Sequence, residues 1–254
     1  MLLELRGVHK RFGAVTALNG VDFHVDSGQV MALVGDNGAG KSTLIKCVAG
    51  IHTIDDGDVL WNGEAVSISG PKDAGALGIE VVYQDLALCD NLDVVQNMYL
   101  GRELLSTFRR LDEAKMEKRA REVLKELSVT TITSVRQQVA GLSGGQRQSV
   151  AVAKAVLWNS KLVLLDEPTA ALGVAQTRQV LDLVRRLAEN GLAVVLVSHN
   201  MSDVFEVADQ ITVLRLGQNV AEFDKDKTTQ REVVEAITAG QLSRVPGMHE
   251  ESIA

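Results

Sequence analysis

The chain has 254 residues, 46% of them hydrophobic, and a formal net charge of -7. This apolar content suffices for one large α/β domain, with or without a helical insertion, so a disordered chain is not expected. The negative charge argues against a nucleic-acid binder, since affinity for duplexes depends on basic side chains that neutralise phosphates. No apolar run approaches the ~18 residues that span a bilayer.

We expect a cytoplasmic location because the N-terminus does not resemble a signal peptide. The first ten residues lack the basic region, apolar core and cleavage site of a signal peptide. The two cysteines, Cys47 and Cys89, lack the spacing of a zinc site or a disulfide framework, and we expect both to be reduced.

The first sixty residues are predicted to form antiparallel β-structure around one buried strand. Val21, Phe23 and Val25 alternate with polar residues, as in a half-buried strand, whereas residues 30–34 are continuously apolar, as in a central strand. Asp-Gly and Asn-Gly pairs bracket residues 58–61, which predicts a hairpin-like turn arrangement.

From about residue 90 the pattern becomes helical, and we predict a helical subdomain over about 90–158. One helix face carries apolar residues at i, i+4, i+7, i+8 and i+11: Met116, Ala120, Val123, Leu124 and Leu127. After Ser143 helices and strands alternate, which predicts a doubly wound core with parallel crossovers. The expected order is a helix to about 158, a strand at 162–165, a helix near 174–188, a strand at 192–197, a hairpin at 210–214 and 218–223, and a helix at 228–239.

The fold class predicted from this order is α/β, with a mixed, largely parallel sheet, an N-terminal antiparallel β subdomain and a helical insertion. Residues 1–240 are expected to form a single domain, and residues 241–254 a poorly ordered tail.

A phosphate-binding loop lies between the buried apolar strand and a helix, where such loops occur. It consists of Gly35, Asp36, Asn37, Gly38, Ala39, Gly40, Lys41, Ser42 and Thr43. Glycines allow backbone N–H groups to surround phosphates, and the helix N-terminus adds positive partial charge. Lys41 is expected to reach the β- and γ-phosphates and the Ser42 hydroxyl to bind Mg²⁺, so the sequence predicts a bound nucleotide. Together with the α/β order of elements, this loop predicts a P-loop NTPase core.

Two carboxylates follow the apolar strand at 162–165. We expect Asp166 to hold Mg²⁺ through water and Glu167 to orient or deprotonate the attacking water. A strand that ends in two acids means little alone, but it gains weight beside a phosphate-binding loop.

The segment Leu142-Ser143-Gly144-Gly145-Gln146 indicates the family. Ser143 can cap the following helix, and the two glycines leave backbone N–H groups uncovered as an anion site. With the phosphate loop upstream and Asp166-Glu167 downstream, this segment closely resembles the signature motif of ATP-binding cassette (ABC) ATPases. The resemblance extends from about residue 3 to residue 240.

This resemblance implies an ATP hydrolase that works as a head-to-tail homodimer. Each ATP would lie between the phosphate loop of one subunit and Ser143, Gly144, Gly145 and Gln146 of the other. Phe12 resembles the aromatic residue that stacks on adenine, although Tyr is more common in the family; a core phenylalanine is the alternative reading.

Two further residues gain roles only through the resemblance. Gln84, after the strand 79–83, resembles the glutamine that contacts Mg²⁺ and the attacking water. His199 resembles the histidine that contacts the γ-phosphate; the other histidines, His9, His24, His52 and His249, are given no role.

One position departs from the family pattern. The segment Pro168-Thr169-Ala170-Ala171-Leu172 is commonly followed by an aspartate that senses the opposite site, and this chain has Gly173 there. Communication across the dimer through that carboxylate is therefore in doubt, but hydrolysis is expected to survive because Glu167 and His199 are retained.

A narrower resemblance, to cassettes of bacterial monosaccharide importers, rests on residues 37–43, 82–85 and 97–103. It implies a peripheral subunit at the cytoplasmic face of the membrane, with a separate permease and, indirectly, a periplasmic solute-binding protein. An importer of another solute, a soluble ABC ATPase of nucleic-acid repair or translation, and a small-molecule kinase are the alternatives.

Overall fold

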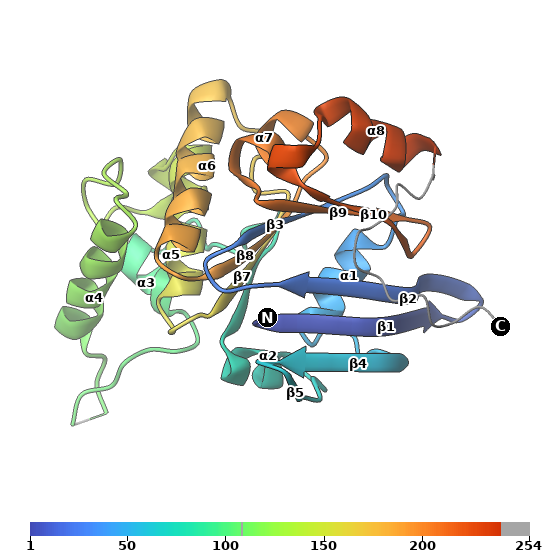
Figure 1. Ribbon diagram of the computed structural model, residues 1–254. Coiled ribbons are helices and arrows are strands. Elements are labelled where there is room, and N and C mark those ends of the chain that lie inside the picture. Colours follow the sequence, from blue (N-terminus) through green and yellow to red (C-terminus); the bar gives the residue numbers. More distant parts are fainter. Residues whose placement is uncertain (108, 240–254) are drawn as a thin grey trace.

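The computed structural model describes residues 1–107 and 109–239, whose strands form two sheets (Figure 1). One is antiparallel, in the order β2 (Val15–Val25), β1 (Leu3–Phe12), β4 (Asp56–Trp61) and β5 (Glu64–Ala65). The other has the order β10 (Gln218–Asp224), β9 (Gln210–Arg215), β3 (Val30–Val34), β8 (Ala193–Val197), β7 (Leu162–Asp166) and β6 (Ile79–Val82). Its β9–β10 pair is antiparallel and its other pairs are parallel, which confirms the mixed sheet and the antiparallel subdomain.

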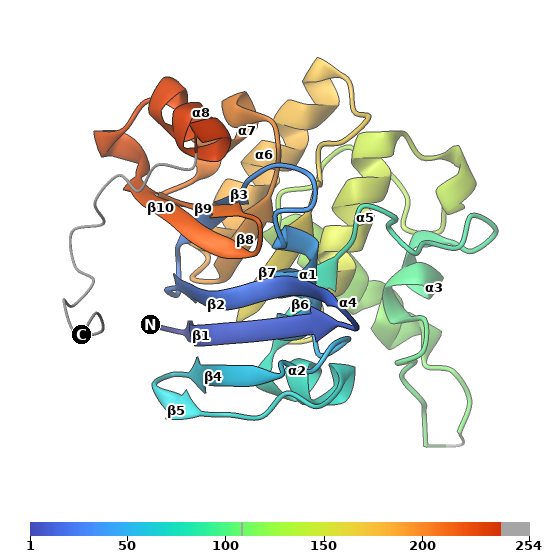
Figure 2. The ribbon, with the colours of Figure 1, turned by 90° about the vertical axis from the view of Figure 1, so that its right-hand side faces the viewer.

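The helices cover both faces of the six-stranded sheet. They are α1 (Lys41–Val48), α2 (Pro71–Leu77), α3 (Val94–Tyr99), α4 (Glu113–Glu126), α5 (Gly144–Val156), α6 (Val174–Glu189), α7 (Met201–Val207) and α8 (Gln230–Ala239), with 3₁₀ turns at Val139–Gly141 and Lys225–Lys227. Figures 1 and 2 place α6, α7 and α8 on one side of this sheet and the antiparallel sheet on the other. None of the helices in residues 1–107 and 109–239 combines the length and the apolar content needed to cross a bilayer.

The central strands are apolar throughout because both faces of the sheet are covered. In β7, Leu162 and Leu164 pack in the cluster that contains the antiparallel sheet and α1. The alternate residues Val163 and Leu165 pack with the apolar residues of α4, α5 and α6, since successive side chains of a strand point to opposite faces. The predicted apolar face of α4 is buried in this second cluster.

The predicted helical region after residue 90 contains two separate helices before residue 128. Helix α3 ends before Gly101, whose φ of 81° is unfavourable for other residues. Leu105 and Leu111 then pair in an antiparallel bridge. Asp112 is the N-cap of α4, and its side chain accepts a hydrogen bond from the backbone N of Lys115. A glycine and a capping aspartate therefore divide the segment into two helices.

Sequence reasoning did not single out α2 and α7. Each has only seven residues. In α2 only Ala74 is buried, so it shows no apolar stripe, and the stripe of α7 (Met201, Val204 and Phe205) extends over little more than one turn. The predicted tail, residues 241–254, lies outside the described residues.

Candidate functional site

The predicted phosphate loop connects the end of β3 to the start of α1, as its sequence context requires. Gly35 has φ of 147° and Gly40 has φ of 104°. A Cβ at Gly35 would lie 2.1 Å from the carbonyl oxygen of Leu214, and one at Gly40 would lie 2.8 Å from that of Ala17. Both positions therefore need glycine for the backbone conformation and for close packing.

Lys41, the first residue of α1, folds back over this loop. Its Nζ donates hydrogen bonds to the carbonyl oxygens of Gly35 at 2.6 Å and Asp36 at 3.0 Å. Burial lowers the pKa of Lys41, whereas the carboxylates of Glu167 and Asp166 oppose that shift. The ammonium group thus lies inside the loop, where a phosphate would compete with the two carbonyl groups for it.

The two predicted acids lie where β7 ends beside β8. Asp166 is the last residue of β7 and pairs with Val197 of β8. Glu167 has φ of 51°, and its backbone N donates to the carbonyl oxygen of Val197 at 3.0 Å. Burial, and then the charge of Glu167, raise the pKa of Asp166.

The structure brings His199 to Glu167. His199 Nδ1 lies 2.8 Å from Glu167 Oε2, although the two residues are separated by a helix and a strand along the chain. The carboxylate is largely buried and the imidazole is exposed, with relative side-chain exposures of 18% and 73%. A carboxylate that is held against an imidazole and borders solvent can orient a water molecule.

A buried aspartate that sequence reasoning missed links the loops behind this pair. Asp203 of α7 accepts hydrogen bonds from Thr169 Oγ1 at 2.6 Å and from Asn200 Nδ2 at 3.0 Å. Thr169 follows Glu167 by two residues, and Asn200 follows His199 directly. Asp203 therefore fixes the two loops that carry Glu167 and His199 relative to each other.

The signature segment begins α5 as predicted. Gln146 N donates to Ser143 Oγ at 3.4 Å, and Ser143 N donates to Gln146 Oε1 at 2.8 Å, which together form a capping box. Gln146 Nε2 also donates to the carbonyl oxygen of Thr131 at 2.6 Å.

The two glycines of this segment have a packing role that the sequence did not reveal. A Cβ at Gly144 would lie 2.8 Å from Leu172 Cδ2, and one at Gly145 would lie 3.1 Å from Gln176 Cβ. The start of α5 therefore packs closely against the start of α6. Gly173 is the N-cap of α6, where it offers no side-chain acceptor, and its N donates to Gln176 Oε1 at 3.2 Å.

Most of the remaining predicted residues are exposed, after strands, in the phosphate loop or in the first turn of α1. Gln84 follows β6, which pairs with β7, and is exposed, as are Asp36, Asn37, Gly38 and Ser42. Phe12 ends β1 with 44% of its surface exposed, so it is not the core phenylalanine of the alternative reading.

The predicted magnesium ligands are a hydroxyl (Ser42), an amide (Gln84) and a carboxylate (Asp166). All three supply oxygen donors, which suit a hard cation that keeps several waters and binds few protein groups. Within residues 1–107 and 109–239 no cluster of three or more His, Cys, Asp or Glu side chains offers a separate metal site.

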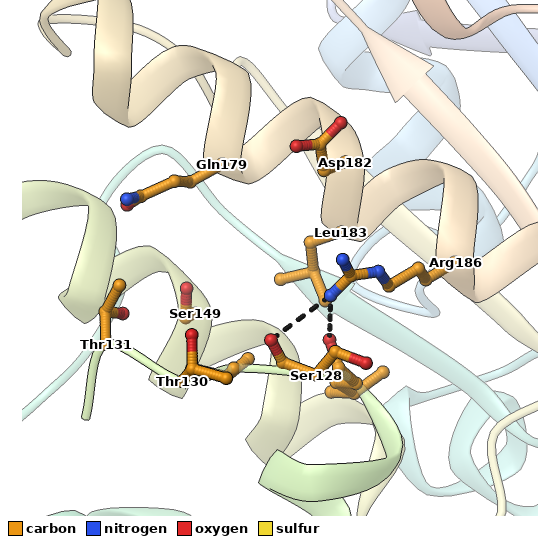
Figure 3. Close-up of a pocket in the computed structure, with 10 residues that line it drawn as sticks. Ser128, Thr130, Thr131, Ser149, Gln179, Asp182, Leu183 and Arg186 are labelled. Carbon is orange, nitrogen blue, oxygen red and sulfur yellow. Dashed lines mark hydrogen bonds between the residues drawn. The ribbon is translucent and has the colours of Figure 1, made fainter. Parts of the chain in front are cut away.

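A cavity of about 160 Å³ lies between the loop after α4 and helix α6, and it contains none of the predicted site residues (Figure 3). Arg186 Nη1 donates to the carbonyl oxygens of Leu127 at 3.0 Å and Ser128 at 3.2 Å. Thr131, which accepts the bond from Gln146, also lines it. The hydrogen bonds of Arg186 therefore connect α6 to the helical region that packs beside the signature segment.

Comparison with known proteins adds independent observations. A family model described as ABC transporter matches residues 18–170. The Xylose/arabinose import ATP-binding protein XylG of Sulfolobus acidocaldarius is 46% identical over 96% of this chain and 96% of its own. The Fructose import ATP-binding protein FrcA of Rhizobium meliloti is also 46% identical, over 94% of this chain and 95% of its own.

Solved structures of ABC transporter cassettes have the same fold. The ADP conformation of MJ1267 superposes with a TM-score of 0.80 at 25% identity and covers 93% of this chain and 94% of that one. A dimeric post-hydrolysis state of MJ0796, bound to ADP and Pi, has a TM-score of 0.72 at 25% identity and covers 88% of this chain and 98% of that one.

Proposed function

The chain belongs to the ABC transporter family, as an ATP-binding and ATP-hydrolysing subunit, and from this premise we propose that it energises the import of a simple sugar. The relatives that match it over nearly their whole length are import proteins for xylose/arabinose and for fructose. The observation that carries the chemistry is the contact between Glu167, which follows β7, and His199, which follows β8. Strand β3 of the same sheet leads into the phosphate loop.

We assign the chemical roles as follows. On ATP binding Lys41 exchanges its two loop carbonyls for the β- and γ-phosphates. Glu167 orients and polarises the attacking water, while His199 holds Glu167 and contacts the γ-phosphate. Ser42, Gln84 and Asp166 would hold Mg²⁺, which neutralises charge on the phosphates and on the leaving ADP.

The active assembly in this proposal is a head-to-tail homodimer. Ser143, Gly144, Gly145 and Gln146 would approach the γ-phosphate held by the other subunit, with the N-terminus of α5 directed at its charge. The dimeric state of a similar cassette supports this arrangement. ATP would add contacts across the interface and hydrolysis would remove them, so that binding closes the dimer and hydrolysis reopens it.

The partners would be permease subunits in the membrane and, through them, a periplasmic sugar-binding protein. The subunit would lie at the cytoplasmic face of the membrane, with the helical region after Gln84 receiving a short permease helix in a groove. No nucleic acid is expected in the complex, given the net charge of -7.

The test is affinity capture of tagged Glu167→Gln protein from native membranes with ATP, followed by mass spectrometry. This substitution should slow hydrolysis and hold the dimer closed, so a polytopic permease and a sugar-binding protein should co-purify. Lys41→Ala, which should not retain ATP, is the matched control. Recovery of soluble nucleic-acid factors without any membrane protein would reject the importer.

The cargo is tested separately by uptake of labelled xylose, arabinose, fructose and ribose in cells that lack the chain. Loss of uptake of one of these sugars, restored by the wild-type chain but not by Glu167→Gln, is expected. Unchanged uptake of all four would contradict the sugar class.

A further inference from the structure

The Phe12 ring is flanked by two side chains that come from different parts of the fold. The ring centroids of Phe12 and His52 lie 5.0 Å apart with their planes inclined by 72°, an edge-to-face arrangement. Lys10 Nζ lies 5.5 Å from the centroid of the Phe12 ring. The sequence assigned no role to His52, so this contact is a finding of the tertiary structure.

His52 is anchored to the helix that follows the phosphate loop. The backbone N atoms of Ile51 and His52 donate to the carbonyl oxygen of Lys46 at 2.9 and 3.2 Å. Lys46 lies in the last turn of α1, which begins at Lys41. Helix α1 thus has the phosphate loop at its N-terminal end, and the hydrogen bonds at its C-terminal end fix the backbone of His52.

Lys10 is fixed in a similar way. Its Nζ lies 2.7 Å from Asp55 Oδ1, and Asp55 Oδ2 accepts a hydrogen bond from the backbone N of Arg11 at 2.6 Å. Asp55 thus restrains both the ammonium group and the backbone next to Phe12. The Phe12 ring is held on two sides yet remains 44% exposed, which leaves surface for a further flat partner.

We propose that His52 is a positioning residue for the nucleotide base, which holds the Phe12 ring in the orientation that stacks on adenine. The proposal rests on the proposed function, in which Phe12 is the stacking residue. A ring that is already ordered loses less conformational freedom when a base stacks on it. His52 contacts the Phe12 ring, whereas Lys41 lies in the phosphate loop. The contributions of the base and of the phosphates to the binding affinity can therefore be measured separately.

The experiment measures the dissociation constants of Mg·ATP and of Mg·tripolyphosphate for the full chain by calorimetry. His52→Ala should weaken ATP binding about two- to tenfold, the range expected for loss of one aromatic pair, and should leave tripolyphosphate binding unchanged. His52→Phe should restore ATP binding, because it keeps a ring at this position.

Two further variants control the experiment. His52→Leu keeps most of the bulk without aromaticity and carries the same expectation as His52→Ala if that variant does not fold. His24→Ala removes a histidine whose Nε2 lies 3.3 Å from Glu222 Oε1, so both affinities should stay at wild-type values.

Unchanged ATP affinity in His52→Ala, or an equal loss for both ligands, would overturn the positioning role while leaving the ATPase assignment intact. An unmodified chain that binds no ATP would instead reject the proposed function itself. A rise in KM for ATP without a change in kcat, in the reconstituted complex, would support the same role for His52.

Discussion

Replacement of Asp203 by alanine should weaken both the fold and the catalytic pair. Asp203 is 5% exposed and accepts hydrogen bonds from Thr169 Oγ1 and Asn200 Nδ2 at 2.6 and 3.0 Å. A hydrogen bond to a charged group contributes about 1.5–3 kcal/mol, and a donor left unsatisfied in a buried site adds a cost. With two such bonds, both of them partly buried, we expect Asp203→Ala to lower the free energy of unfolding by about 3 kcal/mol, the low end of their summed range.

The fold should survive, since domains are stable by about 5–15 kcal/mol. Urea unfolding followed by circular dichroism gives the change in stability, and ATPase activity of the reconstituted complex gives kcat. Because Glu167 and His199 lie on the loops that Asp203 joins, kcat should fall about tenfold or more.

A double-mutant cycle tests the cause. Thr169→Val removes one donor at nearly constant volume, and its effect should be strongly non-additive with that of Asp203→Ala. Additive effects, or a loss below about 0.5 kcal/mol for Asp203→Ala, the level of an ordinary surface substitution, would refute the bridging role.

Three other variants test separate parts of the structure. Gly35→Ala should destabilise the chain by about 1–3 kcal/mol in urea titration, because its Cβ would lie 2.1 Å from the backbone oxygen of Leu214; Gly141→Ala, which meets only a flexible side chain, should have little effect. Arg186→Met should cost about 1.5–3 kcal/mol through its two bonds to loop carbonyls, with the dissociation constant for ATP unchanged. Asp166→Asn should raise thermal stability at pH 7, because the raised pKa of this buried carboxyl means that ionisation opposes folding. This gain in stability should be absent below pH 3.8, the ordinary pKa of an aspartate, and should appear as the pH rises through the pKa of Asp166 in the folded state. An equal gain in stability at every pH would contradict the electrostatic cause.

Several features were predictable because neighbouring residues in the sequence encode them. The apolar run at 30–34 and the glycine-rich segment after it predict a buried strand followed by a phosphate loop. Ser143 and Gln146 lie at the spacing of a capping box, which the structure contains. Alternation of helices and strands after Ser143 predicts the parallel core.

Other features depend on residues that only the fold brings together. The Glu167–His199 contact follows from the pairing of β7 with β8, and Asp203 joins their loops from a helix too short to recognise by its pattern. No pattern in the sequence indicates that His52 lies against Phe12, since the two rings are forty residues apart.

By itself, the sequence determined the local elements and the chemistry that each could carry, because capping, strand burial and loop conformation depend on residues a few positions apart. The tertiary structure decided which of these groups meet and where glycine is obligatory for packing. Those outcomes depend on strand order and on the close approach of segments that are distant in the sequence, as at Gly35 against the backbone of Leu214, which no short stretch of sequence specifies.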